Sequence, residues 1–256
     1  MSADITDSGG ETRSVSRTFS AAAVGVTANI QSDDNFAIAG QPMAFTVNRQ
    51  DLDGEGSAGS GFWELYQLQQ PAQILMPAEL AADPIDKAAQ AYATQGDQLR
   101  SRWDQDQSID VRSKDWKRGA KVGQGSLKHK DDGQASIEIK APAPGVYRLH
   151  YTTKDQWGQV FRKQQAVIVS NQQRSPLQVP ALLAVQKSSV EVGQQVSLLA
   201  GSGFTQSPVL LEVFHGSKLL RRSVQRGGIK KQQFAVTSEH RGGLTFALTM
   251  VKDYQL

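Results

Sequence analysis

The sequence has 256 residues, 39% hydrophobic and 21% charged, values typical of a globular protein with room for one large or two ordinary domains. No apolar run approaches the roughly 20 residues that a membrane-spanning helix needs, no basic-then-apolar leader begins the chain, and the lack of cysteine excludes disulfides, thiol catalysis and cysteine-bound metals. The net charge of +3 is uneven, because residues 172–256 carry 10 Lys and Arg but 4 Asp and Glu. These cations are spread along predicted strands without a basic helix or an aromatic stacking motif, so we do not expect nucleic-acid binding.

Residues 1–23 are predicted to be the terminal strands of a preceding domain and a linker. Ser8-Gly9-Gly10-Glu11 is turn chemistry, and hydroxyl side chains alternate with other residues from Thr12 onward, as in a strand. A lone hairpin is marginally stable in water. We therefore expect this one to pair with the sheet of another domain, and the stretch 21–25 to be a linker.

Residues 24–171 are predicted to form a β-sandwich of the immunoglobulin or fibronectin III type. Its clearest part is Pro144 to Val169, where two runs with period-two alternation flank the polar, glycine-ending turn Asp155-Gln156-Trp157-Gly158. This pattern predicts a β-hairpin with one buried face. Further extended runs are predicted at 26–31, 43–49, 62–68, 126–130 and 135–140.

A segment in the middle of this domain departs from the strand pattern. Residues 71–125 contain Asp83-Pro84, an acid at the cap position followed by proline in the first helical position. Beyond it, one helical face collects apolar residues, which are Ile85, Ala89, Tyr92, Leu99 and Trp103. We therefore expect a helix over 84–105, within a helical insertion of about 78–120 that lies against the sandwich.

The polar stretch Asn171–Pro180, with two prolines, predicts a domain boundary. Short strands with turns every few residues follow in 172–256 and indicate a second β-sandwich, possibly truncated. Its predicted strands are 182–187, 196–200, 209–214, 219–224, 233–237 and 244–251.

The sequence contains only weak matches to known catalytic and metal-binding motifs. The histidines, at 129, 150, 215 and 240, are far apart in sequence and lack metal-ligand spacing, so structural roles are expected. The stretch Asp51–Gly56 imitates the start of a calcium loop, but Phe62 stands where the bidentate glutamate belongs, and a glycine-rich connection explains it equally. No nucleophile elbow, phosphate loop or paired carboxylates are found. We expect no enzyme activity, no cofactor and no metal.

Two other features leave alternatives open. The tryptophans, at 63, 103, 116 and 157, suit a carbohydrate platform or, more often, the core of a sandwich. A basic segment attracts trypsin-like proteases if it is exposed and mobile, and otherwise forms two charged strand ends around a turn. Its residues are Arg221, Arg222, Arg226, Lys230 and Lys231.

Several phrases together resemble the middle of bacterial alpha-2-macroglobulin-like proteins, over nearly the whole chain. Val190-Glu191-Val192-Gly193-Gln194 is similar to the Pro-Gly-Glu entry turn of the domain that hosts the bait region, although Val192 departs from proline. The other phrases are Gly10-Glu11-Thr12-Arg13-Ser14, Phe36 with Gly40-Gln41-Pro42, Arg49-Gln50-Asp51-Leu52-Asp53-Gly54, Trp63-Glu64-Leu65-Tyr66-Gln67-Leu68-Gln69-Gln70-Pro71, Trp116-Lys117-Arg118-Gly119, Pro144-Gly145-Val146-Tyr147-Arg148-Leu149 and Asp155-Gln156-Trp157-Gly158.

The resemblance implies a structural section of a protease trap, with a macroglobulin-type sandwich at 24–171 and a bait-region-type sandwich at 172–256. Its partners would be target proteases, met through the full-length parent, and neighbouring domains of the same chain. Its location would be the periplasm, the cell envelope or the outside of a bacterium. The bait, around 221–231 or beyond Leu256, cannot be assigned residue by residue, and no catalytic residue carries over. The alternative function is a surface adhesin or carbohydrate-binding array of sandwiches.

Overall fold

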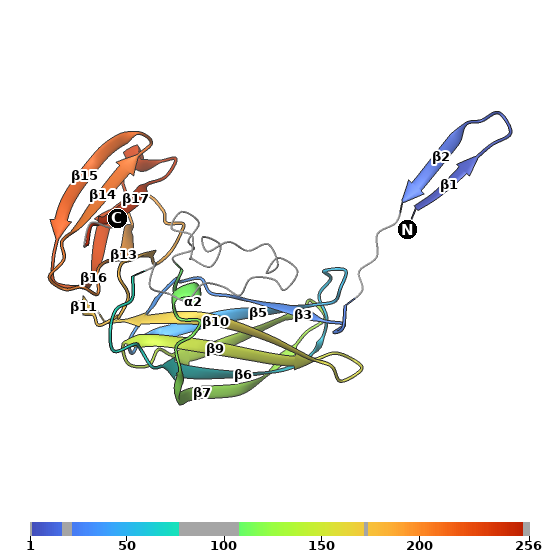
Figure 1. Cartoon of the computed structure of the whole chain (residues 1–256), viewed down its shortest axis with the longest axis horizontal. Coiled ribbons are helices and arrows are strands. Elements are labelled where there is room, and N and C mark those ends of the chain that lie inside the picture. The colour runs from blue at the N-terminus through green and yellow to red at the C-terminus, as the bar shows by residue number, and fades with distance from the viewer. Residues whose placement is uncertain (1, 17–21, 77–107, 172–173, 253–256) are drawn as a thin grey trace, which may run out of the picture.

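The computed structural model describes residues 2–16, 22–76, 108–171 and 174–252. Their secondary structure is almost entirely β, arranged as two sandwiches in tandem with a separate hairpin at the N-terminal end (Figure 1). The all-β tandem sandwich fold expected from the sequence is confirmed. All strand pairs are antiparallel except the short pairing of residues 37–38 with 169–170.

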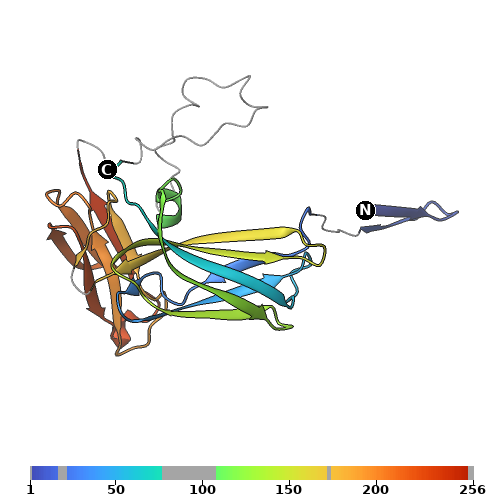
Figure 2. The same cartoon turned by 90° about the horizontal axis from the view of Figure 1, so that it is seen from below.

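The hairpin consists of β1 (Ser2–Thr6) and β2 (Thr12–Ser16) around a turn in which Gly10 has φ of 85°. The Asp7 carboxylate accepts hydrogen bonds from the backbone N–H groups of Gly9 and Glu11 and holds this turn closed. The described side chains of the hairpin are exposed, and Ile5 is 71% exposed. The hairpin therefore lies apart from both sandwiches (Figures 1 and 2).

The first sandwich packs a five-stranded sheet on a three-stranded sheet. In spatial order the larger sheet is β4 (Ala37–Ile38), β10 (Val160–Ser170), β9 (Gly145–Lys154), β6 (Gly59–Leu68) and β7 (Arg118–His129). The smaller sheet is β3 (Thr27–Gln31), β5 (Pro42–Gln50) and β8 (Gln134–Lys140).

Period-two alternation places the core of this sandwich between the two sheets. On β9, Tyr147, Leu149 and Tyr151 are buried and face Phe45 and Val47 of β5 within one hydrophobic cluster. The intervening residues of β9 turn to the outer face of the sheet, as the hairpin pattern of the sequence predicts.

Strand β7 is longer than the strand expected over 126–130, because it begins at Arg118. Glycines at 119, 123 and 125 interrupt the alternation of polar and apolar residues in this stretch. In the structure two of them make room for an indole. A Cβ atom on Gly125 would lie 2.8 Å from Nε1 of Trp63, and one on Gly123 would lie 3.1 Å from its Cζ3. Glycine in a strand often marks such a close approach.

The helix expected over 84–105 lies outside the described residues. The described part of the insertion begins with α2 (Ile109–Arg112), whose first turn is capped by the Ser108 side chain accepting a hydrogen bond from the Val111 N–H. None of the helices in the described ranges has the length and hydropathy that a bilayer span requires.

The second sandwich packs a four-stranded sheet on a three-stranded one. Sheet one is β11 (Arg174–Ser175), β16 (Ile229–Ala235), β13 (Gln195–Gly201) and β12 (Leu182–Val185); sheet two is β15 (Lys218–Gln225), β14 (Val209–His215) and β17 (Thr245–Met250). A short 3-10 turn, η3 (Ser238–His240), precedes β17. The core contains Val196 and Leu198 from one sheet and Leu211 from the other.

Candidate functional site at the junction of the two sandwiches

The connection between the sandwiches is packed as tightly as a core. Leu177 and Val179, which stand among polar residues and prolines, are 2% and 1% exposed. They join residues of both sandwiches in one hydrophobic cluster. Its members are Phe36, Ile38, Leu68, Val146 and Ile168 from the first sandwich, Leu177 and Val179 from the connection, and Leu182, Leu199 and Ile229 from the second. The predicted boundary is thus a shared core between two domains.

A polar clasp stands beside this cluster. The backbone N–H of Asn35 donates to the carbonyl of Gln186 at 2.8 Å, and its Nδ2 donates to the carbonyl of Val185, also at 2.8 Å. Gln186 Nε2 in turn donates to Asp34 Oδ2 at 2.9 Å. Asp34 also lies 3.9 Å from the ammonium of Lys187, an exposed contact that adds little stability. The loop before β4 is therefore hydrogen-bonded to the end of β12.

The connection is also fixed by a side-chain amide. Gln70 Nε2 donates to the carbonyl of Pro176 at 3.0 Å, while Gln70 Oε1 accepts from the N–H of Gln178 at 2.7 Å. On the other side, the N–H of Gly203 donates to the carbonyl of Val179 at 2.9 Å. Backbone groups of the connection thus have partners from both sandwiches, which leaves it little freedom.

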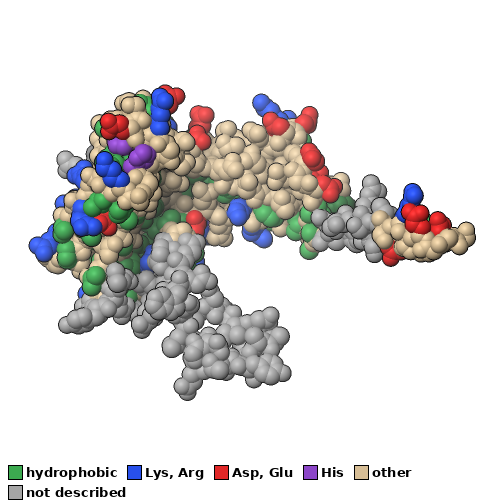
Figure 3. All heavy atoms as spheres, turned by 90° about the horizontal axis from the view of Figure 1, so that it is seen from above, with side chains coloured by type: hydrophobic (Ala, Val, Ile, Leu, Met, Phe, Trp, Pro, Cys, Tyr) green, Lys and Arg blue, Asp and Glu red, His purple; other side chains and the backbone are tan. Residues whose placement is uncertain are grey.

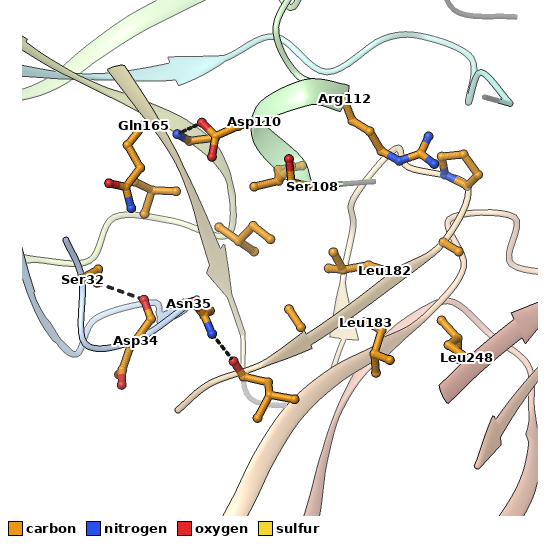
Figure 4. A pocket seen from close by; sticks show the side chains of 18 of the residues that line it. Ser32, Asp34, Asn35, Ser108, Asp110, Arg112, Gln165, Leu182, Leu183 and Leu248 are labelled. Atoms are coloured by element: carbon orange, nitrogen blue, oxygen red, sulfur yellow. Dashed lines mark hydrogen bonds between the residues drawn. The ribbon is translucent and has the colours of Figure 1, made fainter. Parts of the chain in front are cut away.

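A cavity of about 860 Å³ opens next to the junction, between α2, β10 and β12 (Figure 4). Leu182, Leu183 and Leu248 give it an apolar wall. The Asp110 carboxylate is held at its rim, because it accepts a hydrogen bond from the N–H of Ala166 at 2.6 Å. Asp34, Asp110 and Arg112 stand beside this apolar wall, so the described lining is mixed in character.

The basic segment lies on the second sandwich. Arg221 and Arg222 belong to β15, Lys230 and Lys231 belong to β16, and Arg226 stands in the turn between these strands. The structure therefore shows the arrangement of two charged strands around a turn.

That turn is held in place. The N–H of Gly227 donates to the carbonyl of Thr205 at 3.0 Å, and Gly227 and Gly228 have φ of 89° and 93°. The strand that follows starts with Ile229, which is 0% exposed and belongs to the junction cluster. The turn at Arg226 and the shared core are thus adjacent in the chain.

The four histidines are not brought together as one site. His129 is buried: its Nδ1 donates to the carbonyl of Gly133 and its Nε2 accepts from the Tyr151 hydroxyl, both at 2.7 Å, and burial lowers its pKa. Burial, followed by the nearby guanidinium groups, also lowers the pKa of His150. His215 and His240 face each other on the second sandwich, with ring centroids 6.4 Å apart.

The other candidates from the sequence have local roles. The Asp51 carboxylate accepts backbone hydrogen bonds from Asp53 and Glu55, as in an ordinary turn. Among the described residues, no cluster of three or more His, Asp or Glu could hold a metal ion. Trp63 is buried, Trp116 packs at the junction cluster and Trp157 is 69% exposed at the tip of the β9–β10 hairpin, so these three form no common platform. Trp103 lies outside the described residues.

Sequence reasoning missed a buried arginine that organises the glycine-rich connection. Arg49 is 4% exposed, and its guanidinium donates to the carbonyls of Ser57, Ala58 and Lys154 and to the hydroxyls of Ser57 and Thr153. A Cβ atom on Gly59 would lie 2.8 Å from its Cζ. The available signal was one arginine in a strand that otherwise alternates cleanly.

The Asp155 turn is a second such group. The N–H groups of Gly25, Gln159 and Trp157 donate to its carboxylate at 2.8, 2.8 and 2.9 Å and hold the pKa of this carboxyl below its usual range. Since Gly25 precedes β3, this turn fixes the entry of the chain into the first sandwich.

No protein-family model matches the chain, and no curated protein matches its sequence. Among solved structures, Escherichia coli alpha-2-macroglobulin in its native conformation is similar, with a TM-score of 0.36, 8% identity, and coverage of 89% of this chain and 14% of that one. Salmonella alpha-2-macroglobulin reacted with methylamine has a TM-score of 0.33, 13% identity, and coverage of 95% and 15%. Invasin, a bacterial integrin-binding protein, has a TM-score of 0.30, 12% identity, and coverage of 90% and 36%.

The chain therefore spans about one seventh of the length of these alpha-2-macroglobulins. At these TM-scores and identities the neighbours assign neither a family nor a function to it. What stands independently of them is a pair of β-sandwiches with a common core at their junction.

Proposed function

We propose that this chain is a structural section of a bacterial alpha-2-macroglobulin-like protease trap, supplying a scaffold sandwich and a bait-hosting sandwich and no reaction centre of its own. Its location would be the periplasm or cell envelope, and its partners target proteases engaged by the full-length parent. The resemblance in the sequence suggests this function. The structural observation that supports it is the position of Ile229 between the turn at Arg226 and the junction core.

A trap of this kind must convert one peptide-bond cleavage into a movement of domains. Arg226 is exposed, and Ile229, which follows it closely, is fully buried in the cluster shared with Leu177. The pairing of Ile229 with Ser175 also ties the start of β16 to the connection. A cut after Arg226 would free the N-terminal end of β16, and so weaken the packing that holds the two sandwiches together.

Limited trypsin digestion followed by mass spectrometry tests the first step on this chain. We expect the first cut after Arg226, because the other four basic candidates lie in paired strands and a protease needs a locally opened backbone. The variant Arg226→Gln should slow this cut, while Arg13→Gln in the exposed N-terminal hairpin should not. Uniform resistance of residues 205–252 would contradict the assignment of the bait to this turn.

The second test uses the full-length parent protein. A protease mixed with a trap stays active on small peptide substrates and loses activity on large protein substrates. Equal loss on both substrate classes would indicate ordinary active-site inhibition, and no loss on either would contradict the trap function.

A further inference from the structure

We propose that the free edge of β15 is a strand-addition site for an acidic, extended segment of a partner protein. In the described part of the chain, β15 pairs with β14 alone, so one side of this eight-residue strand offers backbone N–H and C=O groups. Such an edge is a template for another strand unless it is blocked. The proposal does not depend on the trap function.

The core-facing side chains of β15 include polar groups that lack hydrogen-bond partners among the described residues. The register pairs Arg221, Ser223 and Gln225 with buried residues of β14, so the three lie on the core-facing side of the sheet; Ser223 and Gln225 are half-buried there, whereas Arg221, next to the β-bulge, is exposed. The Ser223 hydroxyl and both polar atoms of the Gln225 amide are buried, and they have no hydrogen-bond partner among the described residues. Leaving such groups unpaired lowers stability, because their hydrogen bonds to water are lost and not replaced. Polar side chains of an added strand would lie directly across from them.

The opposite, solvent-facing side of β15 exposes two apolar side chains with an ion pair between them. Leu219 is 39% exposed and Val224 is 68% exposed. Between them Arg222 binds Glu212 at 2.7 Å, which leaves no net charge at that position. Figure 3 shows hydrophobic and basic side chains next to each other on the second sandwich. An added strand with β-branched residues on this face would cover both exposed side chains.

The positive charges on and next to β15 favour a negatively charged partner. Lys218 and Arg221 lie on the strand, Arg226 follows it, and none of the three has an ion-pair partner among the described residues. Two copies of β15 would place these cations against each other, which disfavours self-pairing. Protection against aggregation explains Lys218 and Arg221, but leaves the buried atoms of Ser223 and Gln225 without partners. An acidic strand satisfies both observations.

The probe is a fluorescein-labelled octapeptide in which Val or Ile alternates with Asp, Glu or Thr. Fluorescence anisotropy gives its affinity, and hydrogen–deuterium exchange locates it. We expect slower exchange in β15, weaker binding at higher salt, and a loss of roughly tenfold or more for a peptide with Lys in place of the acids or with the alternation scrambled.

Charge reversal supplies the matched variants. Arg221→Glu should weaken binding roughly tenfold, whereas Lys128→Glu, an exposed cation on the edge strand β7, should leave it unchanged. Both sites are exposed, so both variants should fold. Equal binding of the acidic and Lys peptides, protection of another edge, or self-association of the free chain through β15 would each overturn the proposal.

Discussion

Replacing Leu177 by alanine should uncouple the two sandwiches. The side chain is 2% exposed in the cluster that both share. Its truncation removes about three carbon groups, worth roughly 2.4 kcal/mol at about 0.8 kcal/mol each, and the cavity left behind brings the cost to about 2–5 kcal/mol. That is a large part of the roughly 5–15 kcal/mol by which a domain is stable. Because the contact lies between domains, the loss falls on their coupling.

The distribution of tryptophan provides the assay, because all four tryptophans precede residue 172. In urea titrations, tryptophan fluorescence reports on the first sandwich and far-ultraviolet circular dichroism reports on both. The two transitions should coincide in the wild type and separate in Leu177→Ala, with the second sandwich unfolding at lower urea. Leu219→Ala, at a partly exposed leucine of β15, is the control and should shift neither transition by more than about 0.5 kcal/mol. Coincident transitions in Leu177→Ala with a loss below about 1 kcal/mol would refute the shared-core reasoning.

Three further predictions concern the first sandwich. Burial lowers the pKa of His129, so as the pH falls the unfolded chain binds this proton before the folded chain does, and the free energy of unfolding should fall below about pH 6.5. In urea titrations, His129→Gln should reduce the slope of this pH dependence by up to about 1.4 kcal/mol per pH unit. The contribution of His150, whose pKa is also lowered, should remain. Gly61→Ala should lower the melting temperature, since the new Cβ would lie 2.3 Å from the Tyr151 ring; an unchanged melting temperature would contradict this packing. Arg49→Ala should cost about 3 kcal/mol or more by leaving buried acceptors unpaired, and Arg49→Lys should recover less than half of it in the same titrations.

Period-two alternation was sufficient to predict β9, because Tyr147, Leu149 and Tyr151 are buried and the residues between them are polar and half-buried. On β10 the alternation does not hold, since its last five residues are all buried. Alternation was also insufficient for β7, where the glycines that accommodate Trp63 interrupt it. The start of β16 was missed for a related reason. Ile229 follows two glycines and precedes two lysines, and it is buried in the cluster that the two sandwiches share.

The candidate site was harder to predict than the fold, because its residues gain their roles only from contacts between the two domains. Asn35 and Gln186 are polar residues in two separate turns, and nothing in the sequence indicates that they form a hydrogen bond across the junction. Leu177 and Val179 give a stronger signal, since they are spaced two apart in a polar stretch with prolines. Two apolar residues at this spacing are not expected in a flexible linker.

The junction also determines whether a cut in the second sandwich has any structural effect. Most loops of a β-sandwich can be cleaved while the strands on both sides stay paired, because each strand keeps its ladder and its side of the core. The turn at Arg226 differs, since the first residue of the next strand, Ile229, packs outward into the core shared with the first sandwich. Full burial of an isoleucine side chain stabilises by about 1.5–3 kcal/mol. Freeing that end of β16 would therefore weaken the same interface that Leu177 supports, whereas a cut in the turn between β14 and β15, which is remote from the junction cluster, would leave it intact.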